Sequence, residues 1–407
     1  MKRLLRSLIL MIILVSFVAA CTEDNSNKPR PTATLGEILW QRPAEVITAA
    51  NAEKLQLIGH FGGHKKTVSA MAFSSDNLRL ATSSTEDKLV QVWNLASGRL
   101  VRAITDLNAQ HLFFSADNNT LYTIGTDMKL YAWSLLDETQ RSEGIQGSTN
   151  IVGPVAQSAD LKRLAVGSID GRLLVFTLDP LEEVARTDAH FFPVQDVLFS
   201  PDGNTVITLG QEGHIRLWKF DTLELIHTLG QFQPPPQDIA LSADGRLLAA
   251  SFADSITIWQ LDNDYLPLRE FAIPEFSAGT LAFSPDQNML ITTGDGELVN
   301  IWNVNTGELV AGLPNHNLRI GVATFSQDNQ LVLTGTNGPN LFLWNLAAAE
   351  TIQQGNAEQL RVPSAQIAPQ QLSTLDVYRA AWSPDNKIIA ISDARGAVYI
   401  LGIPSGE

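Results

Sequence analysis

The chain has a single cysteine, Cys21, among its 407 residues, so no disulfide can form within it. Positive charge is also scarce, because 28 Lys and Arg residues stand against 43 Asp and Glu residues, for a net charge of −15. Nucleic-acid binding needs clusters of basic side chains that neutralise phosphates. The composition therefore argues against a nucleic-acid partner, whereas a hydrophobic content of 44% is ample for a large core.

Catalytic signatures are missing as well. The seven histidines form no HExxH or HxH arrangement, and a zinc site has no support without such spacing. No glycine-rich phosphate loop is present, and Ser168 in "GSIDG" is wrongly placed for a nucleophile elbow. The acidic segment "LDNDY" lacks the further ligands of a calcium loop. The sequence thus predicts no catalytic residue, no metal and no cofactor.

The first twenty residues have the features of a secretory signal. Lys2, Arg3 and Arg6 precede an apolar run that is too short for a comfortable membrane span. The segment from Val18 to Cys21 resembles a bacterial lipobox, in which the cysteine is lipidated and becomes the new N-terminus. We expect residues 1–20 to be a signal peptide and lipidated Cys21 to hold the chain on a membrane in the cell envelope, outside the cytoplasm. The alternative is an ordinary secretory signal with a chance cysteine.

Two short segments separate this signal from the body of the chain. Residues 21–34 are polar, contain proline and have no hydrophobic period, which is typical of a flexible linker. Residues 35–54 are apolar in patches, and we expect them to form a short cap against the domain that begins at residue 55.

A repeat of about 42 residues occupies the rest of the chain. The position before a Ser-x-Asp turn recurs eight times and is aromatic or apolar in every unit but the third, at Phe73, Phe114, Gln157, Phe199, Leu241, Phe283, Phe325 and Trp382. A second residue follows each of these by 18–20 positions, at Trp93, Trp133, Phe176, Trp218, Trp259, Trp302, Trp344 and Leu401. Each unit has four short apolar runs separated by turn residues. A small sheet of this kind must stack on its neighbours to bury both faces, which predicts a β-propeller.

Units such as "FSPDGNTVITLGQEGHIRLW" and "GHKKTVSAMAFSSDNLRLATSSTEDKLVQVWNL" resemble WD repeats. The resemblance extends from about Leu55 to Ile403 and implies one four-stranded blade per repeat. The family usually has seven blades, but eight units here predict eight, with seven as the alternative.

The ends of the chain indicate how the ring closes. The last unit supplies three strands, and "LQLIGHFGG", Leu55 to Gly63, is an apolar strand before the first full unit. We expect this N-terminal strand to pair with the last blade and complete it. The long interval before Trp382 predicts an extended loop between Ala347 and Leu375.

The family resemblance also implies a buried polar network in each blade. Its members are a histidine, a Ser or Thr on the second strand, a turn aspartate and the third-strand tryptophan. Only the first unit carries all four, as His64, Thr82 (or Ser83), Asp87 and Trp93. The implied role is structural, and other units keep fragments such as His190 with Trp218.

One group of loop residues differs between the units in a way that suggests a binding surface. Seven residues before the first repeated position, the fourth to sixth units place Phe192, Pro234 and Phe276, with Phe191 and Phe232 nearby. Clustered exposed aromatic side chains mark interfaces. The alternative is that these rings fold down into the packing between blades.

Two functions fit these observations. The first is a membrane-anchored platform for protein–protein interaction, with protein partners that the sequence does not name. The second is a propeller-type extracytoplasmic enzyme, or a binder of small ligands or carbohydrate, with a site at the central channel. Three or more carboxylate or histidine groups that converge at the channel would favour the second function.

Overall fold

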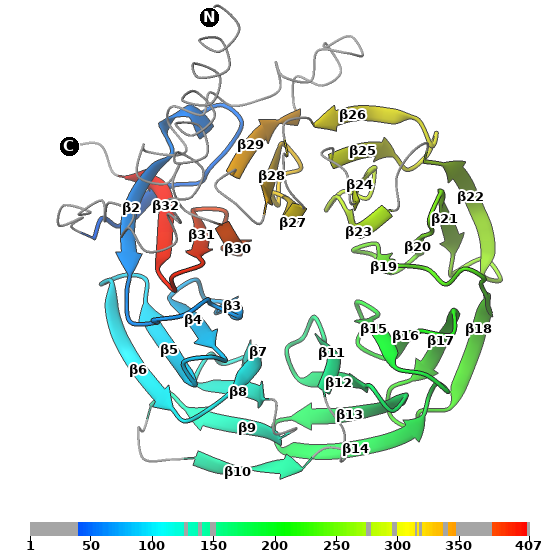
Figure 1. The fold of residues 1–407 in the computed structure, drawn as a ribbon, viewed down its shortest axis with the longest axis horizontal. Helices are drawn as coiled ribbons and strands as arrows, with labels where there is room; N and C mark the ends of the chain where they lie inside the picture. The colour runs from blue at the N-terminus through cyan, green and yellow to red at the C-terminus, as the bar shows by residue number, and fades with distance from the viewer. Residues whose placement is uncertain are drawn as a thin grey trace, which may run out of the picture. The chain divides into compact units, whose positions relative to one another are not determined.

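Eight antiparallel β-sheets stand side by side around a central opening, as Figure 1 shows. This computed structural model describes residues 40–125, 129–136, 141–146, 152–273, 278–294, 299–313, 316, 320–336, 341–346 and 377–404. The helical element whose bounds lie wholly within these residues is a short 3-10 turn, η2 (Ala52–Lys54). The chain is therefore an all-β propeller, and the prediction of eight blades rather than seven is confirmed.

Blades one to four follow the chain, each from the innermost to the outermost strand. Their strands are β3 (Ala70–Phe73), β4 (Arg79–Ser84), β5 (Leu89–Asn94) and β6 (Arg99–Thr105); β7 (Ala109–Phe114), β8 (Thr120–Gly125), β9 (Lys129–Ser134) and β10 (Arg141–Gln146); β11 (Val152–Gln157), β12 (Arg163–Ser168), β13 (Arg172–Leu178) and β14 (Leu181–Asp188); and β15 (Val194–Phe199), β16 (Thr205–Gly210), β17 (His214–Lys219) and β18 (Leu225–Gln231).

Blades five to eight continue in the same way. Their strands are β19 (Asp238–Leu241), β20 (Leu247–Ser251), β21 (Ser255–Gln260) and β22 (Leu266–Ala272); β23 (Ala278–Phe283), β24 (Met289–Gly294), β25 (Val299–Asn303) and β26 (Leu309–Leu313); β27 (Ile320–Phe325), β28 (Leu331–Thr336) and β29 (Leu341–Asn345); and β30 (Val377–Trp382), β31 (Ile388–Asp393) and β32 (Val398–Pro404).

The two repeated positions of the sequence occupy one row across every blade. In the first blade, Phe73 pairs with Leu80, which in turn pairs with Trp93. The weak member Gln157 has the same register, because it pairs with Leu164 and Leu164 pairs with Phe176. The period of the sequence is therefore the period of the blades, since each unit places the same residues at the same depth.

The Ser-x-Asp turns join the first and second strands and have the same hydrogen bonds in all eight blades. The serine hydroxyl donates to the aspartate carboxylate, for example from Ser200 to Asp202 at 2.6 Å. It also accepts from the backbone N–H five residues later, that of Thr205 in this blade, at 2.9 Å. The repeated pair thus stabilises its own turn in every blade.

Apolar side chains fill the spaces between blades. The clusters found among the described residues each draw on two neighbouring sheets, such as Leu164 and Phe176 of blade three against Tyr122 and Leu130 of blade two. Each sheet thus covers the face of the next one, which a separate sheet of four strands could not do for itself.

The N-terminal strand closes the ring, as predicted. Strand β2 (Gln56–Phe61) pairs antiparallel with β32, and a short strand β1 (Pro43–Glu45) pairs with β32 as well. Ile58 of β2 is fully buried in a cluster with Ile388 and Ile400 of the last blade. The two ends of the repeat region therefore meet in one sheet, which fixes the ring without a covalent link.

A stack of three aromatic rings holds the segment before β2. The rings of Trp40 and Phe61 lie 5.2 Å apart, and those of Phe61 and Trp93 lie 4.6 Å apart and almost parallel. Trp40 sits so close to Gly59 that a Cβ there would lie 2.4 Å from its ring. The segment around Trp40 is thus packed on the last blade and on the first.

Several predictions from the sequence fall on residues outside those described. These are the signal peptide, Cys21 and the linker, the start of the expected cap, the loop between Ala347 and Leu375, and Phe276. No helix among the described residues has the length and apolar character needed to span a membrane.

Candidate functional site

A buried polar network in blade four orders the loop that carries the candidate surface. The side chain of His190 contacts Glu212 through Nδ1 at 2.6 Å and Thr208 through Nε2 at 2.7 Å. The indole N–H of Trp218 donates to the hydroxyl of Thr208 at 2.9 Å. All four side chains are buried, so the hydrogen bonds that join them are shielded from water.

Burial and charge together determine which groups of this network are protonated. Burial lowers the pKa of His190 more than the hydrogen bond and charge of Glu212 raise it, so the imidazole is neutral at pH 7. Burial also opposes ionisation of Glu212, but its hydrogen bond with His190 contributes to holding the pKa of this carboxyl below its usual value. With a neutral ring, we assign the donors in one direction, from Trp218 to Thr208, from Thr208 to His190 and from His190 to Glu212.

The first blade has a less complete network than expected from the sequence. His64 contacts Thr82 at 2.9 Å, so Thr82 rather than Ser83 is its partner. Asp87 accepts hydrogen bonds from the backbone N–H groups of Lys65 and Lys66, and its carboxylate lies 3.8 Å from His64 Nδ1. Trp93 is not joined to the network, because its indole nitrogen has no hydrogen-bond partner and its ring stacks on Phe61. This corrects the expectation that the first blade alone is complete.

We expect loss of His190 to cost more stability than loss of His64. His190→Ala leaves Glu212 buried without its close partner, which should lower the free energy of unfolding by about 3 kcal/mol. His64→Ala removes one close hydrogen bond and should cost about 1–2 kcal/mol without abolishing folding. Thermal and urea unfolding of both variants measures the difference, and equal losses would contradict the account of the two networks.

The loop above this network displays Phe191 and Phe192. Phe191 is 87% exposed and Phe192 57% exposed, whereas Ala189 and His190 just before them are buried. The backbone N–H of His190 donates to the carbonyl of Gly171 at 2.8 Å, and that of Gln211 donates to Pro193 at 3.0 Å. Gly171 has φ +83°, and a Cβ there would lie 2.1 Å from the carbonyl oxygen of His190. Two exposed rings are therefore presented on a fixed backbone.

The other candidate residues described are in the next loop and have a different environment. Phe232 is half-buried and packs against Phe252 and Trp259, with ring centroids 5.2 and 5.6 Å apart. Pro234 is exposed two residues later. The interpretation of a single aromatic surface thus holds in part, because Phe191 and Phe192 point to solvent and Phe232 lies in the packing of blade five.

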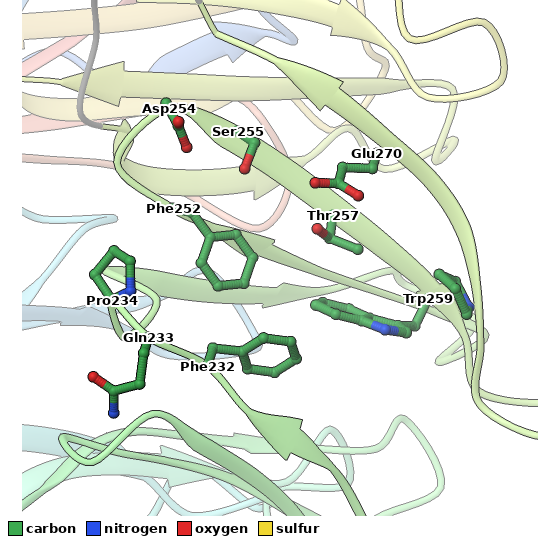
Figure 2. Close-up of a pocket in the computed structure, with 10 residues that line it drawn as sticks. Phe232, Gln233, Pro234, Phe252, Asp254, Ser255, Thr257, Trp259 and Glu270 are labelled. Carbon is green, nitrogen blue, oxygen red and sulfur yellow. The ribbon is translucent and has the colours of Figure 1, made fainter.

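Phe232 and Pro234 line a pocket of about 400 Å³ at the junction of blades four and five. Figure 2 shows the rings of Phe232, Phe252 and Trp259 gathered together, with the carboxylates of Asp254 and Glu270 above them in that view. Strands β21 and β22 supply most of the remaining lining. Sequence reasoning identified Phe232 and Pro234 but missed the other residues of the pocket, which come together only through the strand register.

Two carboxylates occupy neighbouring innermost strands. Asp196 is on β15 and Asp238 is on β19, at equivalent positions of blades four and five. Burial, and secondarily the charge of Asp238, raises the pKa of Asp196 to about 7. Burial raises the pKa of Asp238 to about 6, against the hydrogen bond that it accepts from the backbone of Leu281. Across the described part of the chain, no three His, Cys, Asp or Glu side chains are grouped so that they could hold a metal ion.

Comparisons with known proteins agree with this fold. The family described as WD domain, G-beta repeat matches residues 55–94 and 181–219. The target of rapamycin complex subunit wat1 of Schizosaccharomyces pombe is 27% identical over 234 residues, which are 55% of this chain and 74% of that protein. THO complex subunit 3 of Arabidopsis thaliana is 24% identical over 264 residues, 62% of this chain and 82% of that protein.

Among solved structures, the computationally designed Ika8 protein has a similar fold. It matches with a TM-score of 0.68 at 18% identity, over 86% of this chain and 100% of that chain. At this identity the likeness concerns the fold alone. Together with the sequence matches, it supports a WD-repeat propeller.

Proposed function

We propose that this chain is a lipid-anchored scaffold of the cell envelope that binds a partner protein over Phe191 and Phe192. The observation that carries the proposal is the exposure of two adjacent phenylalanine rings, 87% and 57%, on a loop held by backbone hydrogen bonds. Large apolar side chains exposed side by side on a folded surface favour an interface. A backbone ordered before binding loses little entropy when a partner docks.

The wider context supports the same proposal. Propellers with WD repeats typically hold other proteins on a rigid ring, and two of the relatives are described as subunits of complexes. The basic and apolar residues before Cys21 support export and lipid attachment, and the polar residues 22–34 would let the ring stand away from the membrane. A negative net charge fits this arrangement, since anionic lipid would repel the body of the protein.

The test of the surface is a double substitution, Phe191→Glu with Phe192→Glu. Two rings buried at an interface contribute several kcal/mol to binding. We therefore expect the apparent affinity for the partner protein to fall at least about a hundredfold. Affinity capture of the tagged full chain from detergent-solubilised membranes, with quantitative mass spectrometry, measures the loss.

The matched control is Leu136→Glu with Leu266→Glu. These leucines are 75% and 52% exposed and lie in other parts of the ring, so the control adds the same charge to exposed apolar positions. We expect it to retain the partner. A partner that both double variants retain equally would exclude Phe191 and Phe192 as the binding surface.

A further inference from the structure

Blade five lacks the polar network that orders blade four. Phe232 stands where His190 stands, since the backbone N–H of each donates to the equivalent turn residue, Gly213 and Gly171 respectively. Ala250 stands in the place of Thr208, because each of them pairs with the residue two positions before the tryptophan of its own blade. The third-strand tryptophan is kept as Trp259, so an aromatic cluster has replaced a hydrogen-bonded one.

A second replacement leaves the space beside this cluster open. In blade four, the position two residues before the tryptophan is Arg216, whose guanidinium donates to the carbonyl of Ala189. In blade five, the equivalent residue is Thr257, which is short and lines the pocket. The pocket of about 400 Å³ is thus lined by a short side chain at the position where the neighbouring blade has an arginine.

The charges around the pocket are of one sign. Asp254 and Glu270 line it, and no lysine, arginine or histidine does. Within the part of the chain that the structure describes, neither carboxylate has a side-chain hydrogen bond or an ion pair. Aromatic faces with nearby carboxylates attract an organic cation, because the ring quadrupole and the negative charges act together. The apolar walls suit a flat guanidinium better than a hydrated metal ion.

We propose that this pocket binds an arginine side chain from an extended segment of the partner protein. The guanidinium would stack on the aromatic cluster and pair with Asp254 and Glu270, while the aliphatic stem would cover Phe252. This inference rests on the proposed function in one respect, namely that the ligand is a protein. The pocket and the exposed rings of Phe191 and Phe192 are separate sites, so each can be tested alone.

The experiment selects peptides from a phage-displayed library of random 12-residue sequences on the immobilised full chain in detergent. We expect arginine to be enriched at least about fivefold over the starting library. The best peptide is then synthesised with its arginine and with glutamine in its place. Calorimetric titration should show at least about tenfold weaker binding of the glutamine peptide to the unaltered protein.

Two variants remove the pocket in different ways. Asp254→Asn with Glu270→Gln removes the charges, and Thr257→Arg fills the space with an arginine like that of blade four. We expect each to abolish the preference for arginine over glutamine. Because blade four accommodates Arg216 at the same place, Thr257→Arg should fold, and an unchanged thermal unfolding profile would verify this.

The matched control is Asp264→Asn with Glu308→Gln, which removes two exposed carboxylates elsewhere. It should keep the preference, and so should Phe191→Glu with Phe192→Glu. The proposal is overturned if the unaltered protein selects no arginine, or if both pocket variants retain the preference. Retained partner binding by the Phe191 and Phe192 variant, with an intact arginine preference, would instead refute only the proposed binding surface.

Discussion

Ile58→Asp is expected to unfold the ring or to lower its melting temperature by more than about 10 °C. Ile58 is fully buried between the first and last blades. Its burial contributes about 1.5–3 kcal/mol, and an unpaired buried carboxylate adds a penalty of several kcal/mol. The total is comparable to the whole stability of an ordinary domain. Circular dichroism during heating, with urea unfolding, measures the effect.

The control for this prediction is His60→Asp. His60 lies on the same strand two residues later but is exposed, so the substitution places the same carboxylate in water. We expect its free energy of unfolding to remain within about 0.5 kcal/mol of the unaltered protein. If Ile58→Asp were as stable as His60→Asp, strand β2 would not be what closes the ring.

The second large effect concerns pH. Burial raises the pKa of Asp196 to about 7 in the folded ring, whereas an aspartate in the unfolded chain has a pKa near 3.9. The folded state therefore holds a proton that the unfolded state releases between about pH 4 and pH 7, and the free energy of unfolding falls as pH rises through that window. Asp196→Asn removes this loss.

We expect Asp196→Asn to be about 2 kcal/mol more stable than the unaltered protein at pH 8 and no more stable near pH 4. The full shift would correspond to a larger gain, but Asp196 keeps part of its surface exposed to solvent, which weakens the effect of burial. Asp202→Asn in the same blade is the comparison, because hydrogen bonds from Ser200 and Asn204 lower the pKa of Asp202. Urea unfolding across pH 4–8 decides the matter, and an Asp196→Asn variant without a gain at pH 8 would contradict the assignment.

The fold could be predicted from the sequence because its signal is repeated. Phe73 and Trp93 lie at the ends of one row in the first blade, and equivalent residues lie in the same row of every other blade. Eight copies of one pattern average out weak members such as Gln157. Ring closure was also predictable, since three apolar runs at one end of the chain and one at the other make a single complete blade.

The polar networks were predicted less well, for physical reasons that the residues show. Glu212 replaces the expected aspartate, and its longer side chain still reaches His190 at 2.6 Å. Trp93 matches the family pattern, but its ring stacks on Phe61 of the closing strand and its indole nitrogen forms no hydrogen bond. A motif gives the type of each residue, whereas a partner from another part of the chain decides which contact forms.

The pocket of blade five could not be found from any single motif. Its residues are separated in the sequence, and each is unremarkable where it stands. The available signal was an alignment of the units, in which Phe232 occupies the position of His190 and Thr257 occupies the position of Arg216. Such departures from the pattern of the repeat are the positions at which we expect one blade to differ in function from another.

The most direct test of a partner bound over Phe191 and Phe192 is site-specific photo-cross-linking in living cells. A photoreactive phenylalanine analogue replaces Phe192 in one strain and Leu136 in another. We expect a protein adduct in the membrane fraction for position 192 and none for position 136, with the adduct lost from that fraction when Cys21→Ser is introduced. The same adducts at both positions, or none at position 192, would contradict the proposed scaffold.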